Sequence, residues 1–124
     1  MIDVIERLAD QSGKYRKEAF YYVARAIESS HERIREEEKQ RRHISGSELV
    51  DEVIALGRDE FGYLAKAVLD YWGIRKTEDI GEIVFMMVDN GILSAQDSDS
   101  KQDFANLCDL TAVFEDQYTD FEAE

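Results

Sequence analysis

The fold is decided by residues 64–93, which read LAKAVLDYWGIRKTEDIGEIVFMMVDNGIL. Two apolar runs in this stretch end in the same way, at Gly73-Ile74 and at Gly91-Ile92. A glycine just after the last apolar residue suits the left-handed conformation that ends a helix, and the isoleucine after it can fold back onto the last turn. The stretch therefore predicts two helices joined by a short turn, with Thr77 capping the second one.

The second of these helices is apolar nearly all round, because Phe85 and Met86 widen a face that already contains Ile80, Ile83, Val84, Met87 and Val88. A helix of this kind is normally buried. Trp72, at the end of the first helix, is expected to be a core anchor whose truncation to alanine costs about 3 kcal/mol. Gly73→Ala is expected to cost on the order of 1 kcal/mol.

Helical spacing also runs through the rest of the chain. Apolar residues from Ile2 predict a short helix that ends at Gly13, and a longer helix is predicted to start at Tyr15. Ser45 and Glu48 form a capping box for a helix that stops or bends at Gly62. The sequence predicts an all-α protein, or a mainly α protein with at most a short β-hairpin. We expect a bundle of about five to six helices around a central helix-turn-helix pair.

The length of 124 residues fits a single domain, 1–124. Three segments lack a periodic apolar pattern. Residues 36–43 are predicted to be an exposed charged connector, and residues 94–101 an exposed loop. Residues 117–124 are predicted to be a frayed acidic tail.

The charge balance restricts the classes of partner. Charged residues make up 35% of the chain and the formal net charge is -13, so the surface must be strongly acidic. Such a surface disfavours nucleic acid and anionic membranes. Cys108 is the only cysteine, which fits a reducing compartment. No signal peptide and no run long enough to cross a bilayer is found, so we expect a cytoplasmic protein.

Two acidic motifs are candidates for a metal site. Glu28 and His31 form one Glu-x-x-His pair, the half-motif that di-iron helical bundles use twice, and the chain has no second copy. The acidic residues at positions 97, 99 and 103 are spaced like ligands of a calcium loop. However, Lys101 would stand where an oxygen ligand is needed. We expect a plain helical histidine and an exposed acidic loop.

The sequence offers no set of residues for acid-base or nucleophilic catalysis. Cys108 lies beside Asp109, and a nearby negative charge raises the pKa of a thiol, which makes it a poorer nucleophile. The glycines stand singly, so no phosphate-binding loop is present. We therefore predict no catalytic, cofactor-binding or metal-binding residue and no cofactor, and we lean away from an enzyme.

Two short basic segments interrupt the acidic chain and are candidates for contact with an anion. Arg41, Arg42 and His43 form the first, and Arg75 and Lys76 form the second. The alternative is that these cations pair with Glu36 to Glu38 or with the acidic tail. We favour the alternative, because isolated charge runs are weak indicators of a binding site.

A family resemblance is carried by four strings in combination: RHISGSEL at 42–49, WGI at 72–74, TEDIGEIVF at 77–85 and GILS at 91–94. Together they resemble a family of small uncharacterised bacterial proteins that is named only after a locus tag. The resemblance implies one small bacterial domain. It implies no activity, cofactor or catalytic residue.

These observations favour a non-enzymatic protein-interaction or adaptor domain. Apolar residues in excess of what one modest core needs are expected to line a groove for a protein partner: Tyr21, Tyr22, Phe85 and Met86. The acidic surface would select a basic partner. A homodimer is a further alternative to a different protein partner.

The alternative is a winged-helix-like regulatory module. A helix, a short turn, a capped helix and a Gly-Ile-Leu segment before a polar loop also describe a helix-turn-helix that leads into a strand and wing. That reading needs a β-hairpin at residues 92–105. The second helix would then read DNA, but it offers Asp79, Glu82 and Phe85 where base readers want basic or amide side chains. DNA binding is therefore disfavoured.

Overall fold

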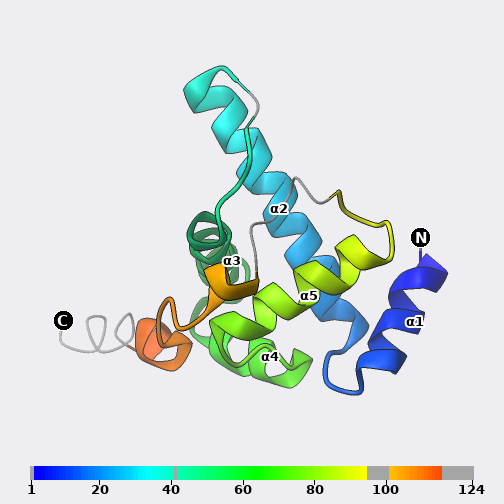
Figure 1. The fold of residues 1–124 in the computed structure, drawn as a ribbon. Coiled ribbons are helices and arrows are strands. Elements are labelled where there is room, and N and C mark those ends of the chain that lie inside the picture. Colours follow the sequence, from blue (N-terminus) through cyan, green and yellow to red (C-terminus); the bar gives the residue numbers. More distant parts are fainter. Residues whose placement is uncertain (1, 41, 95–100, 116–124) are drawn as a thin grey trace.

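α-Helices make up most of the chain, and no strand occurs in the part of it that the structure describes (Figure 1). The computed structural model describes residues 2–40, 42–94 and 101–115. The elements are α1 (Ile2–Ser12), α2 (Lys17–Glu38), α3 (Gly46–Phe61), η1 (Gly62–Leu64), α4 (Ala65–Trp72), α5 (Thr77–Asp89) and η3 (Lys101–Phe104), where η marks a 3₁₀ turn. Residues 110–115 form a further helical turn. The predicted all-α class is confirmed.

The most enclosed element is α5, which packs against α2, α3 and η3. Its inward residues are completely buried: Ile80, Gly81, Ile83, Val84 and Met87. Figure 1 shows α5 crossing in front of the long helix α2, with α1 beside the start of α2 and α4 at the lower edge. α4 packs on α2 and α3. The apolar pattern of α5 therefore predicted its burial correctly.

Both predicted Gly-Ile stops are confirmed. Gly73 has φ +101° and Gly91 has φ +76°. In each stop the isoleucine N–H donates to the carbonyl oxygen five residues back, at 2.8 Å after α4 and 2.9 Å after α5. The glycine N–H donates to the carbonyl three residues back, at 3.0 and 3.1 Å. This pair of hydrogen bonds is the Schellman motif, and it leaves Ile74 completely buried.

The cap predicted for α3 is also present. The Glu48 N–H donates to Ser45 Oγ at 3.1 Å, and the Ser45 N–H donates to Glu48 Oε1 at 3.0 Å. These reciprocal bonds satisfy two backbone donors that the helix itself leaves unpaired. Asp109 caps the last helical turn in the same manner, accepting the Ala112 N–H at 3.2 Å.

The prediction that Thr77 caps α5 is wrong. Thr77 is the first residue of the helix and is completely buried. Its hydroxyl donates to the Phe104 carbonyl oxygen at 2.6 Å and accepts the Leu107 N–H at 3.2 Å. A segment far away in the sequence therefore uses this hydroxyl. The local pattern could not reveal that partner.

Two further predictions on the N-terminal half need correction. α2 begins at Lys17, not at Tyr15, and Tyr15 is a buried residue of the connection before it. Trp72 is half-buried and not a fully enclosed anchor. Its ring packs at 5.4 Å from Tyr22 and 5.7 Å from Phe61, measured between ring centroids.

Glycine lets η3 approach the helices closely. A Cβ on Gly81 would lie 2.8 Å from the Phe104 side chain, and one on Gly46 would lie 2.8 Å from the Asp103 carbonyl oxygen. Phe104 is buried as a result. Of the loop predicted at 94–101, the last residue begins η3 and residues 95–100 lie outside the described residues, as does the tail predicted at 117–124.

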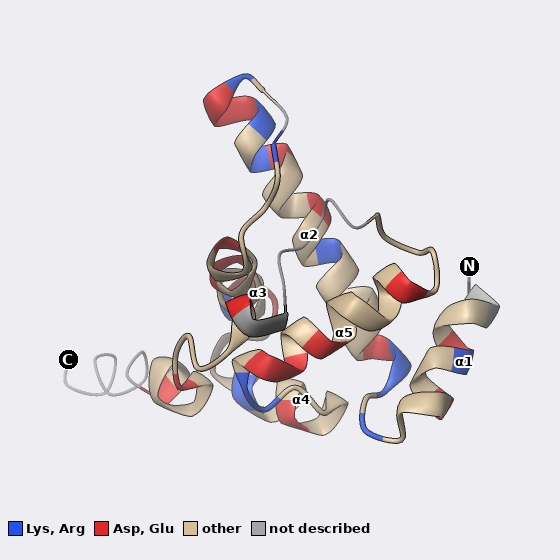
Figure 2. Cartoon of the chain, in the orientation of Figure 1, with Lys and Arg blue, Asp and Glu red and all other residues tan. Residues whose placement is uncertain are grey.

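The end of α2 and the chain after it project beyond the rest of the molecule (Figure 1), and this projection is dense in acidic and basic residues (Figure 2). The segment predicted as a connector, 36–43, starts with exposed residues of α2. Arg42 connects α2 to α3, because one of its guanidinium nitrogens lies 2.7 Å from Glu38 Oε2 and 2.7 Å from Glu48 Oε2. This bridge ties the end of α2 to the start of α3.

The bridge predicts a measurable dependence of stability on pH. Arg42 and the Ser45 N–H lower the pKa of the Glu48 carboxyl from 4.5 to about 2. A lowered pKa adds stability that is present above about pH 4.5 and is lost as the pH falls toward 2. We expect Arg42→Gln to reduce the free energy of unfolding at neutral pH only slightly, because the bridge is largely exposed to solvent. It should also flatten the loss of stability in acid.

Urea unfolding at a series of pH values tests this expectation. Arg7→Gln, which removes an exposed cation of α1, is the matched control and should change neither quantity. An acid profile of Arg42→Gln that matches the wild type would show that the bridge does not act on Glu48.

Candidate protein-interaction surface

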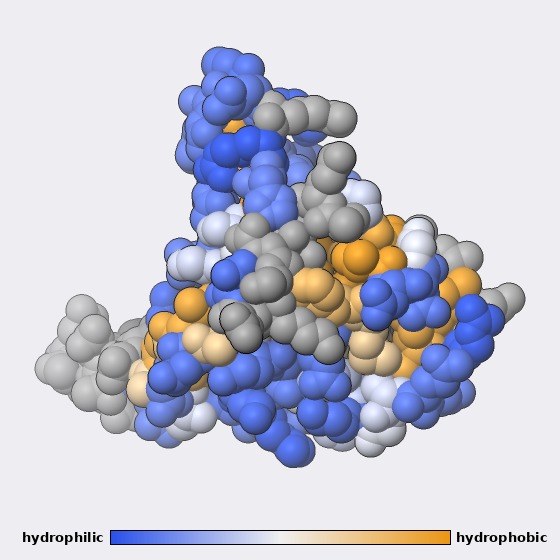
Figure 3. Space-filling view, in the orientation of Figure 1, coloured by the Kyte–Doolittle hydropathy of each residue, from blue (hydrophilic) through white to orange (hydrophobic). Residues whose placement is uncertain are grey.

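The residues that the sequence proposed for an apolar groove are all at least partly buried. Tyr22 is buried, and its hydroxyl donates to the Val53 carbonyl oxygen at 2.6 Å, so its assignment to a surface is wrong. Tyr21, Phe85 and Met86 are half-buried and pack against the core. Figure 3 shows apolar residues gathered near the end of α5. Most of the apolar excess counted in the sequence is therefore used in packing.

The two basic segments are not brought together. The first lies on the projection and the second in the turn between α4 and α5, at the opposite end of the view (Figure 1). Arg42 is engaged by two carboxylates, His43 is exposed, and Arg41 lies outside the described residues. Arg75 and Lys76 are exposed. For Arg42, the pairing with Glu38 is the alternative that the sequence analysis favoured.

A partly buried polar cluster joins the start of α2 to the start of α5. The Tyr15 hydroxyl donates to Asp79 Oδ1 at 2.7 Å and lies 3.0 Å from Glu82 Oε2. The Lys14 ammonium donates to the same Glu82 oxygen at 3.3 Å. Asp79 Oδ2 accepts the backbone N–H groups of residues 75–76 at 2.9 and 3.1 Å. Asp79, and not Thr77, therefore caps α5.

The chemistry of this cluster is structural. Burial and the two carboxylates raise the pKa of the Tyr15 phenol far above its ordinary value, so the phenol remains protonated and acts as a donor. Both oxygens of Asp79 are occupied by donors of the chain. A carboxylate in this state is not available as a general base.

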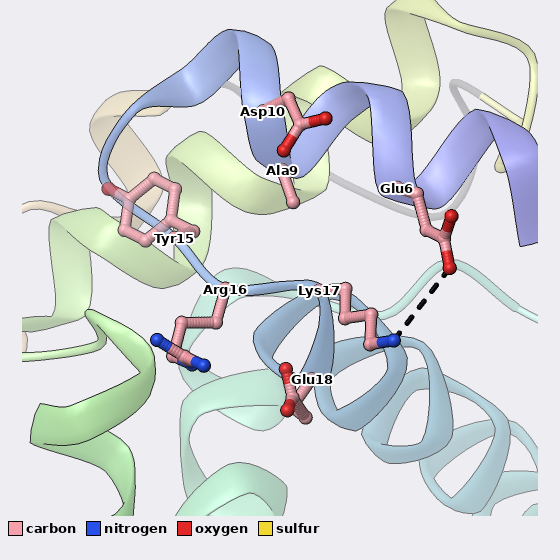
Figure 4. A pocket seen from close by; sticks show the side chains of 7 residues that line it. All are labelled: Glu6, Ala9, Asp10, Tyr15, Arg16, Lys17 and Glu18. Carbon is pink, nitrogen blue, oxygen red and sulfur yellow. Dashed lines mark ion pairs between the residues drawn. The ribbon is translucent and has the colours of Figure 1, made fainter.

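A hollow of about 510 Å³ lies between α1 and the start of α2, and Figure 4 shows the side chains that line it. The lining residues are Glu6, Ala9, Asp10, Tyr15, Arg16, Lys17 and Glu18. A 3.7 Å ion pair between Lys17 and Glu6 spans it. The hollow is open and mostly charged, and its lining holds no nucleophile with an adjacent base.

The other chemically reactive residues are dispersed. Within residues 2–40, 42–94 and 101–115, no three histidine, cysteine or acidic side chains converge to hold a metal ion. Burial, Asp51 and Asp109 raise the pKa of the Cys108 thiol. The predicted direction of that shift is confirmed.

Among the residues that the structure describes, the most exposed large apolar side chains lie on η1 and α4. Tyr63 is 76% exposed, Leu64 is 57% exposed and Tyr71 is 65% exposed. Ala67, also exposed, lies between Leu64 and Tyr71 on the helix. These four residues are here called the α4 face. Residues spaced by three, four and seven share one side of a helix, so Leu64, Ala67 and Tyr71 form a continuous outward stripe.

The α4 face is held in place by the start of α2. The Arg16 guanidinium stacks on the Tyr71 ring at 4.5 Å from the ring centroid. The Arg16 backbone N–H donates to the Trp72 carbonyl oxygen at 3.0 Å. Tyr71 is thus exposed but oriented, and such preorganisation lowers the entropy lost when a partner binds.

The α4 face was not among the residues predicted from the sequence, although the sequence contains a signal for it. Ala65, Leu69 and Trp72 fall on one side of α4, while Leu64, Ala67 and Tyr71 fall on the other. An eight-residue helix that is apolar on two sides needs two partners. The core supplies the partner for the first side only.

The helix that a winged-helix protein would place in DNA is not free in this fold. α5 is enclosed by α2, α3 and η3. Of the residues that the hairpin at 92–105 would need, 92–94 and 101–105 are described and contain no strand. Neither feature favours the winged-helix-like module.

Comparisons with known proteins give no relative. No protein-family model matches the chain, no curated protein is similar to it, and no solved structure resembles it. Within the described residues, none of the helices combines the length and the apolar character that a membrane span requires.

Proposed function

We propose that this protein is a non-enzymatic protein-interaction domain that binds another protein surface through the α4 face. The observation that carries the proposal is the exposure of two tyrosines and a leucine in one place: Tyr63, Leu64 and Tyr71. Tyrosine is enriched among the residues that dominate binding energy at protein interfaces. An exposed apolar patch on a small, highly charged protein is a feature of interaction sites.

The remaining observations support binding over catalysis. Two polar clusters of the described residues are satisfied by the chain itself, the Tyr15 and Asp79 cluster and the Arg42 bridge. The open hollow has a charged lining, whereas sites for small molecules are mostly apolar with a few polar groups. The α4 face combines a rigid backbone with apolar exposure, which is what a protein partner requires.

Site-specific photocrosslinking in cells of the native host tests this proposal. A photoreactive phenylalanine analogue at Tyr63 or Tyr71 is expected to give a discrete protein adduct. The same analogue at Glu28, an exposed residue of α2, is the control and should give none. Leu64→Asp, combined with the analogue at Tyr71, should abolish the adduct. Equal labelling from Tyr71 and Glu28 would contradict the proposal.

A further inference from the structure

We infer that the partner of the α4 face is a second copy of this chain, bound as an antiparallel α4–α4 pair around a two-fold axis. This inference rests on the proposed function, because it names the protein that the α4 face binds. Three observations carry it: the order of the side chains on α4, the small residue at the centre, and the local charge.

The order of residues on the α4 face is self-complementary. A two-fold interface brings the same patch of both copies together, so each residue meets the residue that mirrors it. For an axis that passes between Ala67 and Val68, Leu64 of one copy faces Tyr71 of the other. The exposed ends of the stripe thus pair an aliphatic with an aromatic side chain at both ends. Helical rise places these ends about 10 Å apart.

The centre of the stripe permits close approach. Ala67 is exposed and has the smallest side chain on this face, and Val68 beside it is half-buried. Two helices with a small residue at the crossing point can approach to an axial distance of about 8 Å. The larger side chains at the two ends can then pack around that crossing.

Local charge favours a second copy over the basic partner expected from the whole sequence. Residues 59–76 contain Asp59, Glu60 and Asp70 against Lys66, Arg75 and Lys76, a net charge of zero in a chain of net charge -13. Lys66 and Asp70 pair with each other, and Arg16 stacks at the edge of the face. Two acidic molecules therefore meet here with less repulsion than the net charge of the whole chain implies, and this region gives a basic partner no excess of carboxylates.

Sedimentation equilibrium of the purified full chain over a wide range of concentration tests the inference. We expect a reversible monomer–dimer equilibrium that tightens with added salt, because salt screens the repulsion between the two acidic bodies. A complex with a basic partner would weaken instead. Leu64→Asp and Tyr71→Ala should each weaken the dimer about tenfold or more. Leu64 is 57% exposed, so the carboxylate of Leu64→Asp would stand in water and the substitution should leave the helix intact.

Leu107→Asp is the matched control, since Leu107 is 39% exposed and lies outside the α4 face. It should leave the dimerisation constant unchanged. A chain that stays monomeric at high concentration and high salt overturns the inference, and so does an equal loss in Leu107→Asp. If the chain is monomeric while Tyr71 still crosslinks to a different protein, the proposed function stands and the second copy is excluded. If neither is found, both fail.

Discussion

Gly73→Ala is expected to lower the free energy of unfolding by about 3 kcal/mol or more. Two costs add at this position. Gly73 has φ +101°, a conformation that residues with a Cβ rarely adopt. A Cβ would also lie against the Lys14 carbonyl oxygen, closer than real Cβ atoms approach an oxygen, and 3.0 Å from a ring carbon of Tyr15. The backbone of Lys14 cannot move without disturbing the cluster around Tyr15 and Asp79.

Gly91→Ala is the matched control for this prediction. Gly91 ends α5 with the same hydrogen bonds and φ +76°, but nothing lies within 4 Å of a Cβ placed there. It should therefore show only the conformational cost, about 1 kcal/mol. Chemical denaturation of both variants separates the conformational cost of a positive φ from the cost of the steric overlap with Lys14 and Tyr15. Equal losses in Gly73→Ala and Gly91→Ala would mean that α4 does not end against the Lys14 backbone.

Phe104→Ala is expected to cost about 3 to 5 kcal/mol, the range for truncating a fully buried phenylalanine. Phe104 is 1% exposed and packs on the backbone of α5 at Gly81. Its carbonyl oxygen also accepts the buried Thr77 hydroxyl. The residue therefore attaches η3 to α5. Leu107→Ala, three residues later and 39% exposed, should cost no more than about 1 kcal/mol.

A double-mutant cycle makes this prediction specific to the contact. Gly81→Ala alone should destabilise the protein by about 1 to 3 kcal/mol, because its Cβ would overlap the ring and Cβ of Phe104. In the Phe104→Ala background the same change should cost much less, since the space is then free. Thermal and urea unfolding give the coupling energy. A coupling close to zero would show that Phe104 does not pack on Gly81.

The prediction for Trp72 changes once its surroundings are known. The sequence placed this residue in the core, whereas it is half-buried between Tyr22 and Phe61. Partial burial leaves less apolar area to lose, so Trp72→Ala should cost about 2 kcal/mol, less than full burial would imply. The comparison with Phe104→Ala shows why burial, and not residue type, sets the magnitude.

The class of the fold and most helix ends can be predicted from the amino-acid sequence, because these are set by residues close together along the chain. The Gly-Ile stops and the capping box at Ser45 satisfy backbone groups within six residues, and all of them are present. The apolar pattern of α5 likewise predicted burial, since a helix with no polar side cannot face water.

The contacts that these residues make with distant segments depend on the tertiary structure and cannot be read from local spacing. Thr77 bonds to residues 104 and 107 and not to its own helix, and Gly81 and Gly46 have a role only because η3 packs on them. Local spacing contains no information on which remote segment approaches a helix. The same limit applies to the candidate site. The pattern 64, 67, 71 marks a second apolar side of α4, but the packing of the core on the other side is what leaves it exposed.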